Sequence, residues 1–135
     1  MSSLGFAGVA TGDIYPARFV KAGTGGFSVT QCGANDPVFG ISQFGTNGPP
    51  IPGATFDKAA IVGQSLRVHK PGERCFVQAG AAITSGNRLK PDADGKGIPL
   101  AGATTAEQYG AVALQDASTG EFCEVEVLIG SYTAT

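Results

Sequence analysis

Glycine and proline interrupt the chain so often that long helices have little room to form. The 135 residues include 21 glycines and 8 prolines. Glycine weakens a helix interior and proline removes one of its hydrogen bonds. No helical spacing of apolar residues extends beyond about two turns, and short apolar runs lie between the breaks. The sequence therefore predicts many short strands joined by turns.

Alternating residues locate the expected strands. We predict strands over 14–21, 27–32, 38–44, 66–70, 74–79, 109–116 and 122–130. The first two runs flank a glycine-rich segment, which predicts a hairpin. The runs on either side of "PGE" (71–73) predict a second hairpin between residues 66 and 79.

The clearest strand pattern is "FCEVEVLIG" (122–130). Its alternation predicts one apolar face made by Cys123, Val125, Val127 and Ile129. Glu124 and Glu126 lie on the other face, where their like charges repel. We favour a solvated face for this pair, and the alternative is a contact with Arg or Lys of a neighbouring subunit.

The segment "LKPDADGKGIPL" (89–100) combines the residue types of a metal loop, a phosphate loop and a tight turn. Asp92 and Asp94 offer two metal ligands, but the late glutamate of a calcium loop is missing. The glycine–lysine pair lacks the Ser or Thr and the glycine spacing of a phosphate loop. Asp-Gly between two extended runs is a strong hairpin signal, so we predict a turn and no metal site.

Charge and composition argue against several classes of partner. The net charge is −2 without a basic block, which argues against nucleic acid. No run approaches the roughly 20 apolar residues that cross a bilayer, so we expect no membrane partner, and the N-terminus lacks the pattern of a secretory signal. No dinucleotide fingerprint is present, and we expect no cofactor.

Cysteine and histidine give no clear catalytic set. Cys32, Cys75 and Cys123 are widely spaced and odd in number, which predicts buried free thiols rather than a zinc site or a disulfide framework. His69 is the sole histidine. A hydrolase built on Cys75 and His69 is a remote alternative, and we expect no catalytic residues.

The expected architecture is all-β: a small antiparallel β-barrel or sandwich with an extended N-terminal arm and long Gly/Pro loops. Residues 1–12 are predicted to form the arm and 13–135 a single β-rich domain. The loop 45–56 contains three prolines and cannot be a central strand. It is either a contact loop or a plain connector.

The second half of the chain resembles a known family. "AGAAITSGNRLKPDADGKGIPL" followed by "YGAVALQDASTGEFCEVEV" is similar to the capsid cement, or head decoration, proteins of tailed phages. The resemblance covers roughly residues 70–130. The matching positions are Gly80, Ala82, Ile83, Gly86, Leu89, Asp92, Gly95, Lys96, Pro99, Gly110, Val112, Ala113, Leu114, Ala117, Gly120, Glu121, Val125 and Val127.

This resemblance implies a structural virion protein, not an enzyme, assembled in the host cytoplasm on the outer capsid surface. Its partners would be the major capsid protein and two further copies of itself, in a homotrimer that clamps neighbouring capsid subunits. The candidate contact residues are Leu4 and Phe6 of the arm, Pro49, Pro50 and Ile51 of the proline loop, and Glu124 and Glu126. The alternative is a small ligand- or glycan-binding β-module that uses the 45–56 loop.

Overall fold

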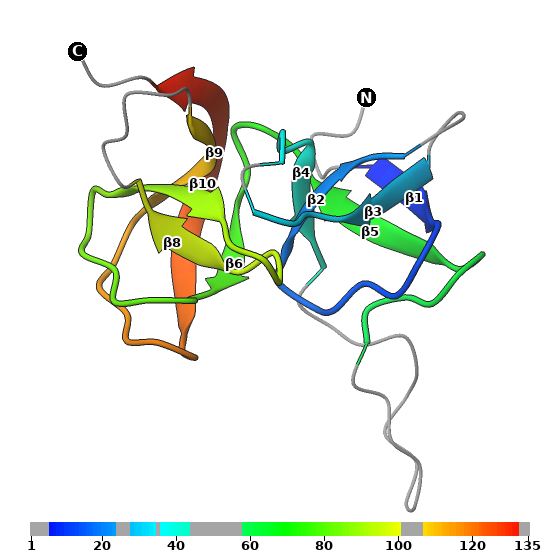
Figure 1. Cartoon of the computed structure of the whole chain (residues 1–135), viewed down its shortest axis with the longest axis horizontal. Coiled ribbons are helices and arrows are strands. Elements are labelled where there is room, and N and C mark those ends of the chain that lie inside the picture. The colour runs from blue at the N-terminus through cyan, green and yellow to red at the C-terminus, as the bar shows by residue number, and fades with distance from the viewer. Residues whose placement is uncertain (1–5, 24–27, 35, 44–57, 101–106, 133–135) are drawn as a thin grey trace, which may run out of the picture.

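A computed structural model of the chain describes residues 6–23, 28–34, 36–43, 58–100 and 107–132. These residues form ten β-strands and no helix, which confirms the predicted all-β class (Figure 1). It follows that none of the described residues belongs to a helix capable of spanning a bilayer.

The first half of the chain forms a closed five-stranded barrel. Its strands are β1 (Phe6–Ala10), β2 (Phe19–Ala22), β3 (Ser28–Gln31), β4 (Gly40–Ser42) and β5 (Ser65–His69). The order around the barrel is β1-β3-β2-β4-β5. β2 and β3 form the predicted hairpin, with Val20 opposite Gln31. β1 pairs antiparallel with β5 and parallel with β3, so the barrel is not antiparallel throughout.

The segment predicted to be an N-terminal arm contributes a strand to this barrel. Phe6 lies opposite Val68 and Val9 opposite Ser65, so residues 6–10 belong to the barrel wall. Pairing satisfies the backbone groups of β1 on both sides, which a free arm would leave to water. Residues 1–5, including Leu4, lie outside the described residues.

The second half forms another five-stranded sheet, of order β6-β10-β9-β7-β8. Its strands are β6 (Arg74–Gln78), β7 (Arg88–Pro91), β8 (Gly97–Pro99), β9 (Glu107–Ala113) and β10 (Phe122–Tyr132). Ala79, the residue after β6, forms a parallel β-bridge with Gly97 of β8, so the two edges of the sheet approach each other. The sheet therefore curls beside the barrel (Figure 1).

The predicted 66–79 hairpin is wrong. The turn itself forms, because Glu73 N donates to Lys70 O at 3.1 Å and Gly72 has a φ of 93°. However, β5 pairs with β1 and β4 in the barrel, whereas β6 pairs with β10. The turn is the corner at which the chain passes from one sheet to the other.

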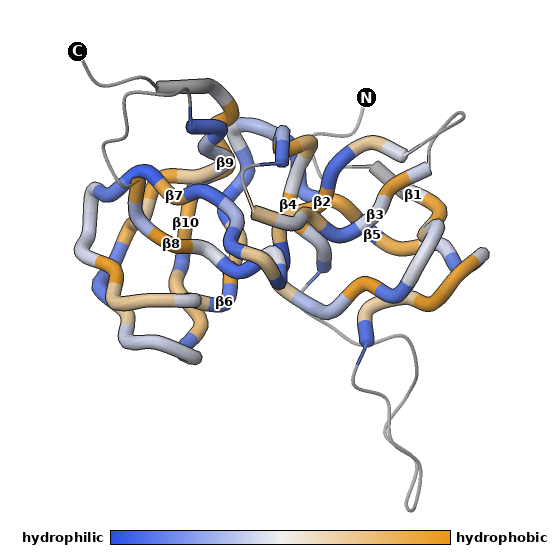
Figure 2. Tube along the Cα trace, viewed as in Figure 1, coloured by the Kyte–Doolittle hydropathy of each residue, from blue (hydrophilic) through white to orange (hydrophobic). Residues whose placement is uncertain are grey.

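Strand β2 separates two hydrophobic cores. Val20 is buried inside the barrel with Val29 and Val68. Its neighbour Phe19 points the other way and is buried among residues of the second sheet, such as Leu89. Figure 2 shows apolar segments in both lobes of the molecule. Because successive residues of a strand face opposite sides, one wall serves both cores.

The alternation predicted for β10 holds for three of its four apolar residues. Cys123, Val125 and Val127 are buried, but Ile129 is 37% exposed. The pairing between β9 and β10 shifts register between Val127 and Gly130, and Ile129 lies within this irregularity. A bulge of this kind breaks the regular alternation of faces, which explains the error.

Candidate contact surfaces

The segment 89–100 forms the predicted hairpin between β7 and β8. Asp92 Oδ1 accepts hydrogen bonds from the backbone N of Asp94 at 2.8 Å and of Lys96 at 2.9 Å. Gly95 has a φ of 78°, a conformation that glycine adopts without steric cost. Asp92 thus caps the turn. Across the described ranges, no three His, Cys, Asp or Glu side chains gather where they could hold a metal ion.

This hairpin turn also docks against the barrel. Phe19 N donates to Gly95 O at 2.8 Å, and Arg18 Nη1 donates to Asp94 O at 2.9 Å. The Arg18 guanidinium also donates twice to Gln78 Oε1, at 3.2 and 2.9 Å. Partial burial lowers the pKa of Arg18, and the carboxylates of Asp94 and Asp92 oppose this effect. The turn therefore holds the two sheets together.

The second sheet presents an exposed surface on the side opposite its core. In β6 the alternation buries Cys75 and Val77, and in β10 it buries Cys123, Val125 and Val127. The intervening residues point outward. We call this surface the outer face; it comprises Arg74, Phe76, Arg88, Val112, Leu114, Phe122, Glu124, Glu126 and Leu128.

Large apolar side chains make up much of the outer face. The exposed fractions are 39% for Phe76, 38% for Leu114, 41% for Phe122 and 43% for Leu128. Exposed apolar residues are ordinary when scattered, but here Phe76 lies on β6, and Phe122 and Leu128 lie on the adjacent β10. Leu114 directly follows β9, the next strand of the sheet. Such grouping is typical of a surface that another molecule covers.

Charged residues cross the outer face in a line. Arg74 lies opposite Glu126, Glu126 lies opposite Val112, and Val112 lies opposite Arg88. Glu124 lies opposite Phe76 in the next row. Both predicted glutamates are therefore half-buried on this surface, among basic and apolar neighbours.

Among the other predicted contact residues, Phe6 is the one that the structure describes. Phe6 lies in β1 of the barrel, on the other sheet. Leu4, Pro49, Pro50 and Ile51 lie outside the described residues, as does the whole 45–56 loop. Of the predicted contact residues that the structure describes, Glu124 and Glu126 lie on the outer face and Phe6 does not.

Sequence reasoning missed the partners of these glutamates. Arg74 and Phe76 alternate with buried residues in "RCFVQ" (74–78). Phe122 and Leu128 occupy the same alternate positions of their strand as the two glutamates. The alternation could have placed each residue on the exposed side of its own strand. It could not show that β6 and β10 are neighbours.

His69 and Glu73 meet at the corner between the sheets. His69 Nδ1 lies 3.0 Å from Glu73 Oε1, and both side chains are mostly buried. Nearby, burial and then the charge of Glu73 raise the pKa of the Cys75 thiol to about 12. The thiol stays protonated at neutral pH, which is the opposite of what a cysteine nucleophile needs.

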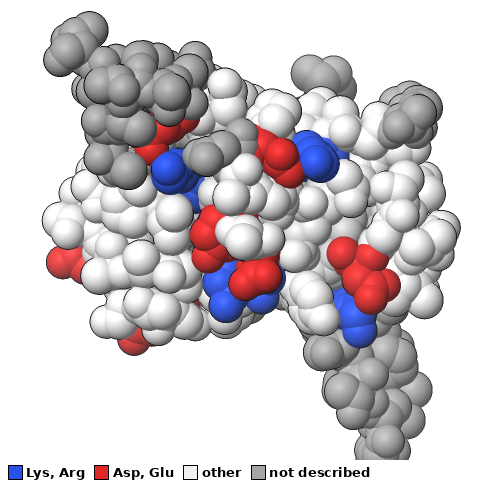
Figure 3. Space-filling model, in the orientation of Figure 1, with Lys and Arg blue, Asp and Glu red and all other residues white. Residues whose placement is uncertain are grey.

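Acidic and basic side chains lie together on the face drawn in Figure 3, in small groups. The ion pair between Lys21 and Asp36 brings Nζ and Oδ2 within 2.8 Å of each other. The hydrogen bond from Lys21, followed by one from the backbone of Gly33, lowers the pKa of Asp36. On this face the coloured residues make no extended patch of one sign.

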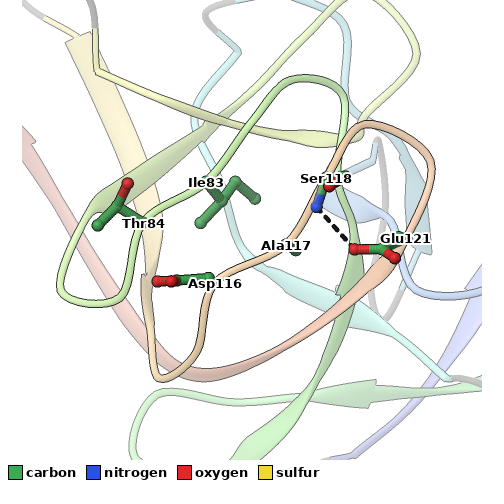
Figure 4. A pocket seen from close by; sticks show the side chains of 6 residues that line it. All are labelled: Ile83, Thr84, Asp116, Ala117, Ser118 and Glu121. Atoms are coloured by element: carbon green, nitrogen blue, oxygen red, sulfur yellow. Dashed lines mark hydrogen bonds between the residues drawn. The ribbon is translucent and has the colours of Figure 1, made fainter.

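A polar pocket of about 300 Å³ lies at one end of the second sheet (Figure 4). Ile83 and Ala117 pair in an antiparallel β-bridge and line the pocket. The other lining residues are Thr84, Asp116, Ser118 and Glu121. Asp116 Oδ1 accepts from Ser85 N at 2.7 Å, and Glu121 Oε1 accepts from Ser118 N at 2.8 Å. Both carboxylates therefore cap turns around the pocket.

Comparison with known proteins identifies a related fold. No protein-family model matches the chain, and no curated protein matches its sequence. Among solved structures, the chain is similar to the N base of head fiber gp8.5 of bacteriophage phi29, with a TM-score of 0.55 and 21% sequence identity. The match covers 91% of this chain and 92% of that chain. The chain shares the fold of this head fiber base over nearly its whole length, and membership of the cement family stays a prediction.

Proposed function

We propose that this chain is a structural protein of a tailed-phage head. The observation that carries the proposal is the fold, because its match to a head fiber base extends over 91% of the chain. The pattern over residues 70–130, which resembles the capsid cement proteins, supports the same assignment independently of that match. Fold alone does not fix function, so binding to heads is the point to test.

In detail, the protein binds the outer surface of the head, bridges neighbouring major capsid subunits and assembles as a trimer. Many copies repeated over a shell make weak single contacts effective. The two sheets share a core and a set of hydrogen bonds around Arg18, which favours a stiff body that can bridge two subunits. Phe6, Leu4 and the proline loop, with Pro49, Pro50 and Ile51, remain proposed contact segments.

The test uses heads of the source phage prepared without this protein. Purified chain is added, and the pellet after sedimentation is analysed for bound copies. Saturable binding supports a head protein, and no binding at micromolar concentrations contradicts it. The temperature at which heads break open is then measured with and without bound chain. A higher breaking temperature with bound chain supports cementing. Binding that leaves this temperature unchanged means that the chain attaches to the head without stabilising it.

The alternative, a small ligand- or glycan-binding module, has one observation in its favour. The pocket is lined by hydroxyl and carboxylate groups together with the apolar Ile83 and Ala117, a combination that small-molecule sites use. Calorimetric titration with a panel of glycans tests it. Binding that disappears in Ser118→Ala or Thr84→Val would favour this alternative over a purely structural role.

A further inference from the structure

We infer that the outer face of the second sheet packs against a second copy of this chain. The inference rests on the proposed trimeric head protein and deepens it by naming the surface through which the copies meet. The sequence pointed to Glu124 and Glu126 alone on this side of the sheet, and the fold comparison assigns no contact surface.

The apolar content of the outer face supplies the attraction. Leu114 and Leu128 are 38% and 43% exposed, and Phe76 and Phe122 expose similar fractions. Aromatic and aliphatic side chains of this kind form the centre of protein–protein contacts, where they leave water on binding. A partner that covers the sheet would remove all four from water together.

The charges identify the occupant. In the row across the sheet, Arg74 and Arg88 flank Glu126 and Val112. Glu124 lies one row further along β10, so the face carries two positive and two negative side chains. A strongly basic or strongly acidic partner would place like charges against half of them. A second copy offers both signs at the same spacing.

The arrangement of strands permits such a contact to repeat. Arg74 is on β6, at one edge of the sheet, and Glu126 is on the adjacent β10. If the β6 side of one copy covers the β10 side of the next, Arg74 of the first lies against Glu126 of the second. A contact between two different parts of a surface closes into a ring when the rotation allows it, and three copies make the proposed trimer.

The experiment measures the mass of the full chain by light scattering and sedimentation velocity, with circular dichroism as a check of folding. The variants are Leu128→Glu, Arg74→Glu, Glu126→Arg and the double exchange of Arg74 and Glu126. Val62→Glu serves as the matched control, because Val62 is a 67% exposed apolar residue on the turn 61–64. This turn directly precedes β5 and lies at the far end of the barrel from the second sheet (Figure 1, green).

We expect the wild type and Val62→Glu to be oligomeric. Each single variant on the outer face should weaken association by about tenfold or more, because it opposes like charges or buries a carboxylate. The double exchange should recover most of the loss from the two charge changes. Folded variants that keep the wild-type mass overturn the inference, and so does a wild type that stays monomeric.

Head binding, measured in parallel, separates this inference from the proposed function. A monomeric wild type that still binds heads refutes the shared surface and leaves the head protein intact. A chain that associates through the outer face but does not bind heads supports the shared surface and refutes the head protein. If the variants keep their mass and lose head binding, the outer face contacts the head and the inference is wrong.

Discussion

Removal of one partner of the ion pair between Lys90 and Glu107 should destabilise the fold strongly. Lys90 Nζ lies 2.6 Å from Glu107 Oε1, and the side chains are 12% and 3% exposed. Lys90 belongs to β7 and Glu107 to β9, which are neighbours in the second sheet. The change Lys90→Met keeps most of the apolar stem but removes the ammonium group that lies against the buried glutamate.

The expected cost follows from the burial of Glu107. Breaking a buried ion pair typically costs about 3–5 kcal/mol, whereas an exposed pair contributes about 0–1 kcal/mol. At 3% exposure the Glu107 side chain is almost fully buried. With an unfolding entropy of about 2.1 cal/mol/K per residue, the 135-residue chain has about 0.28 kcal/mol/K, so a loss of about 4 kcal/mol lowers the Tm by about 14 °C.

The assay is thermal unfolding at neutral pH by calorimetry, supported by urea unfolding. Lys90→Met, Glu107→Gln and the double variant form a mutant cycle, and the double variant should cost less than the sum of the two single changes. Lys21→Met is the matched control, since it removes the lysine of the more exposed pair with Asp36, whose side chains are 36% and 30% exposed. A Tm for Lys90→Met as close to wild type as that of the control would refute the reasoning.

Three further changes test the packing of the two sheets. Phe19→Ala should lower the free energy of unfolding by about 3–5 kcal/mol, because Phe19 is buried in the second core. Calorimetry should show a single transition for both sheets at a lower Tm, and two separate transitions would contradict the shared wall. Gly110→Ala should destabilise by about 1–3 kcal/mol, because a Cβ there would lie 2.8 Å from Phe19 Cε1, whereas Gly12→Ala has open space and should leave the urea midpoint unchanged. Burial raises the pKa of Cys32 and Cys75 from 9.0 to about 12. Above pH about 9 the folded chain keeps thiol protons that the unfolded chain loses, so the urea midpoint should fall as the pH rises. The fall should be less steep in Cys75→Ala. An equal slope in the wild type and Cys75→Ala would show that the Cys75 thiol is not a cause of the fall.

Strands and turns were predictable because they depend on residues close together in the sequence. The Asp-Gly signal in 89–100 specified a turn whose backbone amides are capped by Asp92. The alternation around Val125 specified which side of β10 is buried. In both cases the determining interactions span only a few residues, so no knowledge of the rest of the fold was needed.

Strand pairing was not predictable in the same way. The turn at 71–73 has the residues of a hairpin, yet β5 and β6 enter different sheets. A turn sets the local backbone, but the choice of neighbour depends on which distant strands compete for each edge. Here β1 and β4 occupy both sides of β5. The outer face was missed for the same reason, because Arg74 and Glu126 become neighbours only through the pairing of β6 with β10.

The shared wall links the architecture to the proposed role. Because Val20 and Phe19 face opposite cores, displacing the second sheet from the barrel would expose apolar surface on the β2 wall. Such a displacement would also break the hydrogen bonds that Arg18 makes to Gln78 and to the Asp94 carbonyl. A load applied at the outer face is thus transmitted to the barrel instead of being absorbed by a hinge. Cementing two capsid subunits requires this property, since a body that bends between its contacts cannot restrain what it joins.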